Sequence, residues 1–194
     1  KAGIIKNNIP VVIGETQPET KDVFLGKAAE SGSPVYFADQ ERMLENWNYT
    51  HHMLNLEIAG KKTGEHHHYQ LDLPGFYQSK NLLTVLAATD QLKNKGWKMT
   101  NEQIHHALAH VRKLTGLHGR WEQIRLHPAI ILDVAHNEAG VRQVIAQLEL
   151  EGKSDLHIVL GIVKDKDTDR FLSLLPGYAK YYFTRADIPR AMPE

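Results

Sequence analysis

The chain changes from apolar to polar within one short stretch, Ala129-Ile130-Ile131-Leu132-Asp133-Val134-Ala135-His136-Asn137. The apolar run predicts a buried β-strand over Ala129–Val134, and the residues after Asn137 predict a helix over Ala139–Glu149. The same alternation continues along the chain, with strands expected at 156–160 and 181–184 and a helix at 168–175 between them. Strands that alternate with helices in this way are typical of a Rossmann-like α/β sheet.

The residues before this stretch carry a second α/β pattern. Short apolar runs at 9–14 and 35–38 flank a helix that begins at Pro18, which predicts a βαβ unit with parallel strands. Alternating apolar residues on both sides of a turn at 60–64 predict a β-hairpin over residues 54–73.

Two helices are predicted after the hairpin. The first spans about Ser79–Lys95 and presents one apolar face, formed by Leu82, Val85, Leu86, Thr89 and Leu92. The second begins at the N-cap Thr100, with Gln103 placed for a capping box, and runs to about Leu114. A flexible, glycine-containing joint follows at 115–119, so we predict one domain over residues 1–117 and a second over 118–194.

The composition narrows the class of protein. Of the 194 residues, 42% are hydrophobic, enough for a folded core, and 23 basic residues balance 23 acidic ones. This zero net charge gives no sign of a nucleic-acid or anionic-membrane partner. The chain has no cysteine, which excludes disulfides and thiolate metal sites. No apolar run approaches the roughly 20 residues of a membrane helix. We expect a cytoplasmic monomer.

The most promising polar cluster follows the predicted strand at 129–134. Ligands of open α/β sheets bind at the carboxyl ends of strands, so Asp133 is placed to bond a sugar hydroxyl or to face a metal-bound phosphate. His136 and Asn137 lie where a helix N-terminus offers N–H groups to an anion. Alternatively, Asp133 and Asn137 only cap the helix.

Two further residues are candidates for nucleotide contacts. Arg120 lies at the joint between the halves and could reach a phosphate, or it could pair with Glu122 on the surface. Asn81 lies in the first turn of the long helix, where its amide suits an adenine edge or a phosphate, or is an ordinary polar residue of a helix start. The charged turn at 161–167 could bind an anion or be simply solvated.

Other motifs do not satisfy the requirements of a site. The segment Gly60-Lys61-Lys62-Thr63 resembles the end of a phosphate-binding loop, but the glycine required five residues earlier is Asn55, and no helix follows. His66-His67-His68 lies on a strand, where neighbours point to opposite faces and cannot all bind one metal. His106 and His110 share a helix face without the glutamate of a zinc protease helix, which favours a surface or interface role.

These ordered motifs resemble the bifunctional dihydrofolate synthase/folylpolyglutamate synthase family of the Mur ligase superfamily. The segments that carry the resemblance are Lys1-Ala2-Gly3-Ile4, Leu73-Pro74-Gly75 through Asn81, Gly119-Arg120, Leu132-Asp133-Val134-Ala135-His136-Asn137 and the turn Asp165-Lys166-Asp167. The resemblance implies the end of a central ATPase domain, followed by a Rossmann-like C-terminal domain that is incomplete. Both ends of the sequence look cut, so we expect a piece of a longer protein.

The resemblance also implies a reaction. ATP would activate a folate or dihydropteroate carboxylate as an acyl phosphate, and the amine of L-glutamate would attack it, with Mg²⁺ as cofactor. By resemblance, Lys1 becomes carbamylated and binds the second magnesium ion. Asn81, Arg120 and Asp133 would contact ATP, and His136 would lie near the transferred phosphate or the incoming glutamate. Because no phosphate-binding loop is present, we expect these 194 residues to be inactive alone.

Two other functions remain open at this point. A cell-wall Mur ligase that adds an amino acid to a UDP-muramyl substrate would share the fold and the acyl-phosphate route. A non-catalytic nucleotide-binding module would keep the fold but would need neither Lys1 nor His136.

Overall fold

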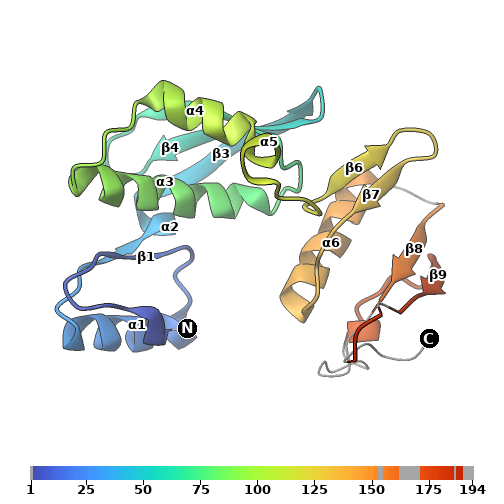
Figure 1. Cartoon of the computed structure of the whole chain (residues 1–194), viewed down its shortest axis with the longest axis horizontal. Helices are drawn as coiled ribbons and strands as arrows, with labels where there is room; N and C mark the ends of the chain where they lie inside the picture. The colour runs from blue at the N-terminus through green and yellow to red at the C-terminus, as the bar shows by residue number, and fades with distance from the viewer. Residues whose placement is uncertain (1, 153–154, 162–170, 186, 190–194) are drawn as a thin grey trace. The chain divides into compact units, whose positions relative to one another are not determined.

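The computed structural model describes residues 2–152, 155–161, 171–185 and 187–189. The chain forms two compact units, Lys1–His118 and Gly119–Glu194 (Figure 1). Each unit contains its own sheets and helices.

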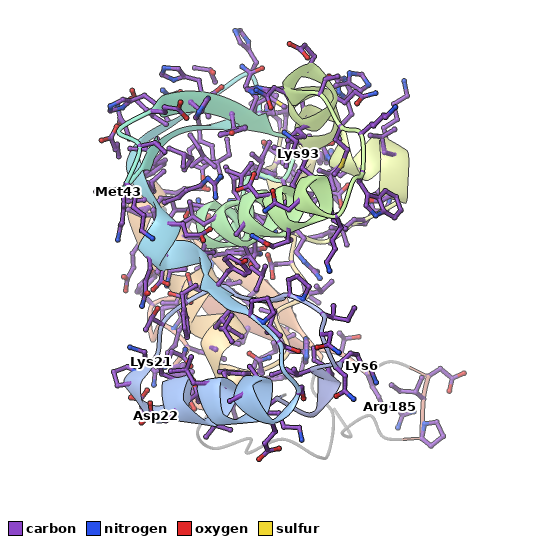
Figure 2. The ribbon with its side chains drawn as sticks, turned by 90° about the vertical axis from the view of Figure 1, so that its left-hand side faces the viewer. Lys6, Lys21, Asp22, Met43, Lys93 and Arg185 are labelled. Atoms are coloured by element: carbon purple, nitrogen blue, oxygen red, sulfur yellow. The ribbon has the colours of Figure 1, made fainter. Side chains whose placement is uncertain are left out.

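The first unit opens with the predicted βαβ unit, which is confirmed. After a short 3-10 helix η1 (Ala2–Ile4), strand β1 (Val11–Ile13) pairs in parallel with β2 (Val35–Phe37), and helix α1 (Pro18–Glu30) connects them. Pro18 begins the helix at a position where its missing N–H costs nothing. The side chains of Lys21 and Asp22 project from this helix (Figure 2).

A three-stranded antiparallel sheet follows the short helix α2 (Ala38–Glu41). Its strands are β3 (Arg42–Thr50), β4 (Met53–Gly60) and β5 (His66–Leu71), in that order. The predicted hairpin is β4–β5 and is confirmed. Strand β3 was not predicted, because a β-bulge breaks its alternation between Leu44 and Asn46. The turn between β3 and β4 is also unusual, because His51 and His52 both take positive φ, and Asn-Gly is the common sequence at such positions.

Helices α3 (Gln78–Asn94) and α4 (Asn101–Ala109) pack against this sheet and form the core of the first unit. Its buried residues are Ala38, Leu54, Leu56, Ile58, Tyr69, Leu71, Leu82, Leu83, Leu86, Ala87 and Leu108. The predicted apolar face of α3 is wrong in part, because Val85 and Leu92 are 45% and 43% exposed. Leu83 and the small Ala87 are buried with Leu82 and Leu86 instead, so the buried stripe is displaced around the helix.

The predicted capping box of α4 is confirmed. The Gln103 N–H donates to Thr100 Oγ1 (3.2 Å), and the Thr100 N–H donates to Gln103 Oε1 (2.9 Å). The predicted continuation to Leu114 is interrupted at His110, after which α5 (Val111–Thr115) begins. The buried carboxylate of Asp72 accepts the N–H groups of Val111 and Arg112, both at 3.0 Å, and so caps a new helix.

In the second unit, the strands predicted at 129–134, 156–160 and 181–184 and the helix predicted at 139–149 are found. Strands β6 (Glu122–Arg125) and β7 (Ile130–Leu132) precede helix α6 (Glu138–Glu151), which is followed by β8 (His157–Leu160) and β9 (Lys180–Phe183). β8 and β9 pair in parallel, as a Rossmann-like unit requires.

The strand predicted at 129–134 is found as β7, but the prediction that it is buried is wrong. β7 pairs in antiparallel register with β6, a strand that was not predicted, and Ile130 and Leu132 are 38% and 45% exposed. An apolar run alone does not distinguish a central strand from one arm of a hairpin. Residues 168–170 of the helix predicted at 168–175 lie outside the described residues. Within the described parts of the chain, no helix combines the length and hydropathy needed to cross a membrane.

Candidate functional site

The β6–β7 pairing brings two of the predicted site segments together. Glu122 lies opposite Leu132, so the residues just before β6 meet those just after β7. The Val134 N–H donates to the Gly119 carbonyl at 3.0 Å and extends the contact beyond the strands. Gly119-Arg120 and Asp133–Asn137, distant in sequence, therefore form one continuous surface.

Asp133 holds these two segments together. Its Oδ2 accepts the Trp121 N–H and its Oδ1 accepts the Ala135 N–H, both at 2.9 Å. The carboxylate therefore satisfies two backbone donors that would otherwise lose hydrogen bonds in a half-buried turn. Asp133 does not cap α6, so that alternative is wrong for this residue, while its predicted contact with a ligand stays a prediction.

The turn requires glycine at position 119. Gly119 has φ +70°, and a Cβ there would lie 2.5 Å from Val134 Cγ1. Its N–H donates to Glu122 Oε2 at 2.9 Å, and Glu122 is only 8% exposed. The proposed pairing of Arg120 with Glu122 on the surface is therefore not the arrangement found, because Glu122 is buried beside the glycine.

Trp121 is the anchor of this turn and was not predicted as such. It takes φ +53°, unusual for a bulky residue, and is 5% exposed. Its indole Nε1–H donates to Glu151 Oε1 at 2.7 Å, which ties the turn to the end of α6. Arg120 is thereby held between a tight glycine and a buried aromatic residue, and its Nη1 donates to the Gly119 carbonyl at 3.2 Å.

The start of α6 lies next to this turn. Asn137 is the N-cap, and its Oδ1 accepts the Gly140 N–H at 2.8 Å, so the capping role considered for this residue is confirmed. A Cβ on Gly140 would lie 3.3 Å from Ala135 Cβ, which shows how closely the loop approaches the helix. The N-terminus of α6, the positive end of its dipole, therefore lies close to the loop that Asp133 holds.

His136 is exposed at the same helix start. Its Nδ1 lies 3.1 Å from the Val134 carbonyl oxygen, so Nδ1 carries the proton in that hydrogen bond. The other ring nitrogen, Nε2, is then an acceptor in the neutral imidazole and a donor in the imidazolium.

The remaining predicted site residues lie in the first unit or outside the described residues. Asn81 belongs to the first unit, is exposed in the first turn of α3, and donates from Nδ2 to Gln78 Oε1 at 2.8 Å. Lys1, predicted as a carbamylated metal ligand, lies outside the described residues, as does the 162–167 part of the charged turn. The roles of Asn81 and Lys1 stay predictions.

The residues that sequence reasoning missed were those with structural roles near the site. Trp121 and Glu151 are 30 residues apart, so no local pattern could pair them. Gly140 had a readable signal: a glycine inside a helical pattern often marks a close approach, here that of Ala135.

Comparisons with known proteins agree with this architecture. Residues 119–194 match the family described as Mur ligase, glutamate ligase domain. The chain is 29% identical to folylpolyglutamate synthase of Lacticaseibacillus casei over 100% of its length, and this covers 45% of that relative. It is also 29% identical to dihydrofolate synthase/folylpolyglutamate synthase of Bacillus subtilis, with 98% of the chain and 44% of the relative covered.

Solved structures of folylpolyglutamate synthases also match this chain. Mycobacterium tuberculosis folylpolyglutamate synthase, in complexes with ADP and AMPPCP, matches with a TM-score of 0.81 and 26% identity over 99% of this chain and 43% of that one. A folylpolyglutamate synthase complex with AMPPCP and folate matches with a TM-score of 0.76 and 27% identity, over 92% and 44% of the two chains. The chain thus spans a little under half the length of the relatives it matches.

Proposed function

Because the chain carries a Mur ligase glutamate ligase domain and is homologous to folylpolyglutamate synthases along its whole length, we propose that it is the C-terminal part of an ATP-dependent folate–glutamate ligase. The acceptor would be folate or dihydropteroate, and the amino acid would be L-glutamate. The observation that carries the proposal is the Gly119–Trp121 turn, which Asp133 fixes beside the N-terminus of α6.

In the proposed reaction, a carboxylate oxygen of the folate takes the γ-phosphoryl group of ATP, and ADP leaves. The glutamate nitrogen then bonds to the acyl carbon, the carbon–oxygen bond to phosphate breaks, and the amine loses a proton. The transferred phosphoryl group carries negative charge on its oxygens. Phosphoryl-transfer sites stabilise this charge with cationic groups held in fixed positions.

The described residues suit the anionic part of this chemistry. We assign Arg120 to a phosphate of the nucleotide, because its position is set by Gly119 on one side and buried Trp121 on the other. The N-terminus of α6, where Asn137 accepts the Gly140 N–H, would offer its remaining backbone N–H groups to an anion. The exposed His136 would place Nε2 toward the transferred phosphate or the incoming glutamate.

Asp133 would act as a positioning residue in this proposal. Both of its oxygens accept backbone N–H groups, so it fixes the turn that carries Arg120. Asn81, in the first unit, stays a candidate for a nucleotide contact, and its amide donates to Gln78. Mg²⁺ would neutralise charge on the phosphates, and its predicted ligand Lys1 lies outside the described residues.

Calorimetric titration with magnesium-ATP tests the proposal. We expect Arg120→Ala and Asp133→Ala to weaken binding, while Arg125→Ala, which removes an exposed guanidinium bonded to the His127 carbonyl, should not. Equal affinity in all three variants would contradict the placement of the nucleotide. If the unmodified chain binds no nucleotide, a phosphate-binding loop elsewhere supplies the affinity, and the same variants must be measured in the full-length ligase.

The alternative substrate class belongs to cell-wall Mur ligases, which share the C-terminal domain family. The names of the matching relatives favour folate. Ligation by the full-length protein with pteroate or folate, and not with a UDP-muramyl substrate, would decide between them.

A further inference from the structure

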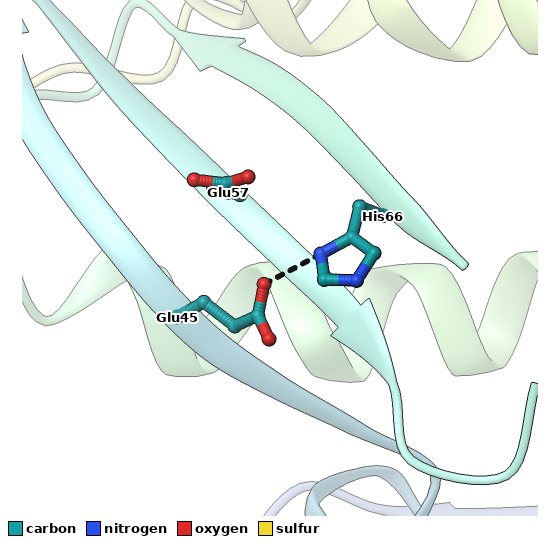
Figure 3. A group of neighbouring side chains, drawn as sticks. All are labelled: Glu45, Glu57 and His66. Atoms are coloured by element: carbon teal, nitrogen blue, oxygen red, sulfur yellow. Dashed lines mark hydrogen bonds and ion pairs between the residues drawn. The ribbon is translucent and has the colours of Figure 1, made fainter. Parts of the chain in front are cut away.

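The outer face of the antiparallel sheet carries a second group of side chains with metal-binding chemistry. Glu45, Glu57 and His66 project from β3, β4 and β5, one from each strand (Figure 3). Their ligand atoms all lie within 4.8 Å of one another. We propose that these three side chains bind a divalent transition-metal ion of the zinc type on the antiparallel sheet of the first unit.

The backbone brings the three residues together. Neighbouring strands lie about 4.8 Å apart, so three side chains from adjacent strands can converge only if the register places them side by side. The β-bulge between Leu44 and Asn46 makes Glu45 the extra residue of β3, next to the position opposite Glu57. Bulges commonly redirect a side chain in this way, and here the bulge turns Glu45 toward His66.

The distances suit a small ion after modest side-chain movement. His66 Nδ1 lies 2.7 Å from Glu45 Oε2, the contact drawn in Figure 3. Bond lengths of about 2.0–2.1 Å in a tetrahedral zinc site separate two ligand atoms by about 3.3–3.4 Å. The pair must therefore open slightly and Glu57 must close in, and all three side chains are 31–53% exposed and free to turn.

The ligand types select the class of metal. An imidazole with two carboxylates suits zinc, nickel or copper, whereas magnesium prefers oxygen ligands and keeps its waters. A fourth side chain supports the site, because His68 Nε2 lies 3.8 Å from Glu57 Oε1 on the same face. Strands are also rigid supports, which lowers the cost of ordering the ligands.

The simplest competing explanation is a surface ion pair between Glu45 and His66 without any metal. The two explanations differ in what Glu57 does: an ion pair does not need it, whereas a three-ligand site loses affinity without it. A second possible metal site is the pair of His106 in α4 and His110 just after it. Their ring centroids lie 4.4 Å apart.

Zinc titration of the whole chain by calorimetry, with variants, separates these possibilities. We expect one strong site, and His66→Gln, Glu45→Gln and Glu57→Gln should each weaken it by at least about tenfold. The matched controls are His67→Gln and Glu65→Gln, which lie on the same strand or beside it but point away from the cluster. Both controls should keep the full affinity, and a large excess of Mg²⁺ should not displace the zinc.

Several results would overturn the proposal. Among them are the absence of a stoichiometric zinc site in the unmodified chain, equal losses in His66→Gln and His67→Gln, and full affinity in Glu57→Gln. Loss of the site in His106→Gln would place the metal on α4 instead. Thermal unfolding of each variant without zinc should match the unmodified chain, since the changed side chains are exposed, and this shows that the variants are folded.

Discussion

The two units hold their chain together in different ways. In the first unit, eleven buried side chains from α2, the sheet and two helices form one contiguous core. In the second unit, the apolar residues that are less than a tenth exposed, among the described residues, are Trp121, Val141, Leu148 and Phe171. Its turn at Gly119–Trp121 depends instead on polar contacts from Asp133, Glu122 and Glu151. Packing therefore defines the first unit, and hydrogen bonds define the candidate site of the second.

The largest effect is expected from cutting into the core of the first unit. Leu54 is fully buried, so Leu54→Ala should lower the free energy of unfolding by about 2–5 kcal/mol through lost burial and a cavity. Leu132→Ala in the second unit should change it by less than about 0.5 kcal/mol, because Leu132 is 45% exposed. Urea denaturation measures both, and similar losses would mean that the units do not differ in this way.

The next effect tests the polar framework of the second unit. Asp133→Ala leaves the N–H groups of Trp121 and Ala135 without their acceptor and should cost about 1–3 kcal/mol. Asp133→Asn keeps one carbonyl oxygen and should cost less. Hydrogen exchange of backbone amides should show the loss only within residues 119–194. Faster exchange in the core of the first unit would contradict independent units.

A smaller effect is expected at the start of α4. Thr100→Ala removes the acceptor for the Gln103 N–H and should destabilise the first unit by about 1 kcal/mol. Thr100→Ser keeps the hydroxyl and should be nearly neutral. Thr89→Ala is the control within a helix, since its hydroxyl bonds only the Val85 carbonyl one turn back. Thermal unfolding provides the measurement, and equal effects at both threonines would argue against a capping contribution.

The smallest effect concerns alkaline pH. Burial raises the pKa of the Tyr69 hydroxyl, with a further rise from Asp90 opposed by Arg42. The folded state therefore holds this proton more tightly than the unfolded state, so the contribution is complete below the ordinary tyrosine pKa of about 10 and is lost as pH rises through the raised value. The free energy of unfolding, measured from pH 8 to 11, should fall less steeply with pH in Tyr69→Phe than in the unmodified chain. An unchanged slope would rule out this group.

The sequence predicted those features that depend on neighbours in the chain. The capping box at Thr100 follows from residues three positions apart, and the βαβ unit and the β4–β5 hairpin follow from the pattern of apolar and turn residues along the chain. Two of the three features it missed depend on distant partners. Helix α5 begins where Asp72, the residue after β5, caps it, and the sheet determines which face of α3 is buried. The third feature, strand β3, carries a bulge and a His-His turn that break its regular pattern.

The candidate site divides along the same line. The sequence predicted site segments at Gly119-Arg120, which lies at the joint between the halves, and at Asp133–Asn137, which follows an apolar strand. It could not identify what Asp133 holds, since the Trp121 N–H lies 12 residues away and reaches it only through the β6–β7 hairpin. Ligand contacts of Asn81, Arg120, Asp133 and His136 stay predictions, with Asn137 now explained as the N-cap of α6.

The burial of Trp121 makes its fluorescence a reporter for the second unit. The chain has three tryptophans, and Trp121 is the single one after residue 118. Its indole is 5% exposed and hydrogen-bonded to Glu151, whereas Trp97 is 65% exposed and Trp47 lies against Phe76 with ring centroids 4.6 Å apart. With Trp47 and Trp97 replaced by phenylalanine, a red shift of the remaining fluorescence would follow the opening of the Gly119–Trp121 turn alone, in real time and at concentrations too low for aggregation.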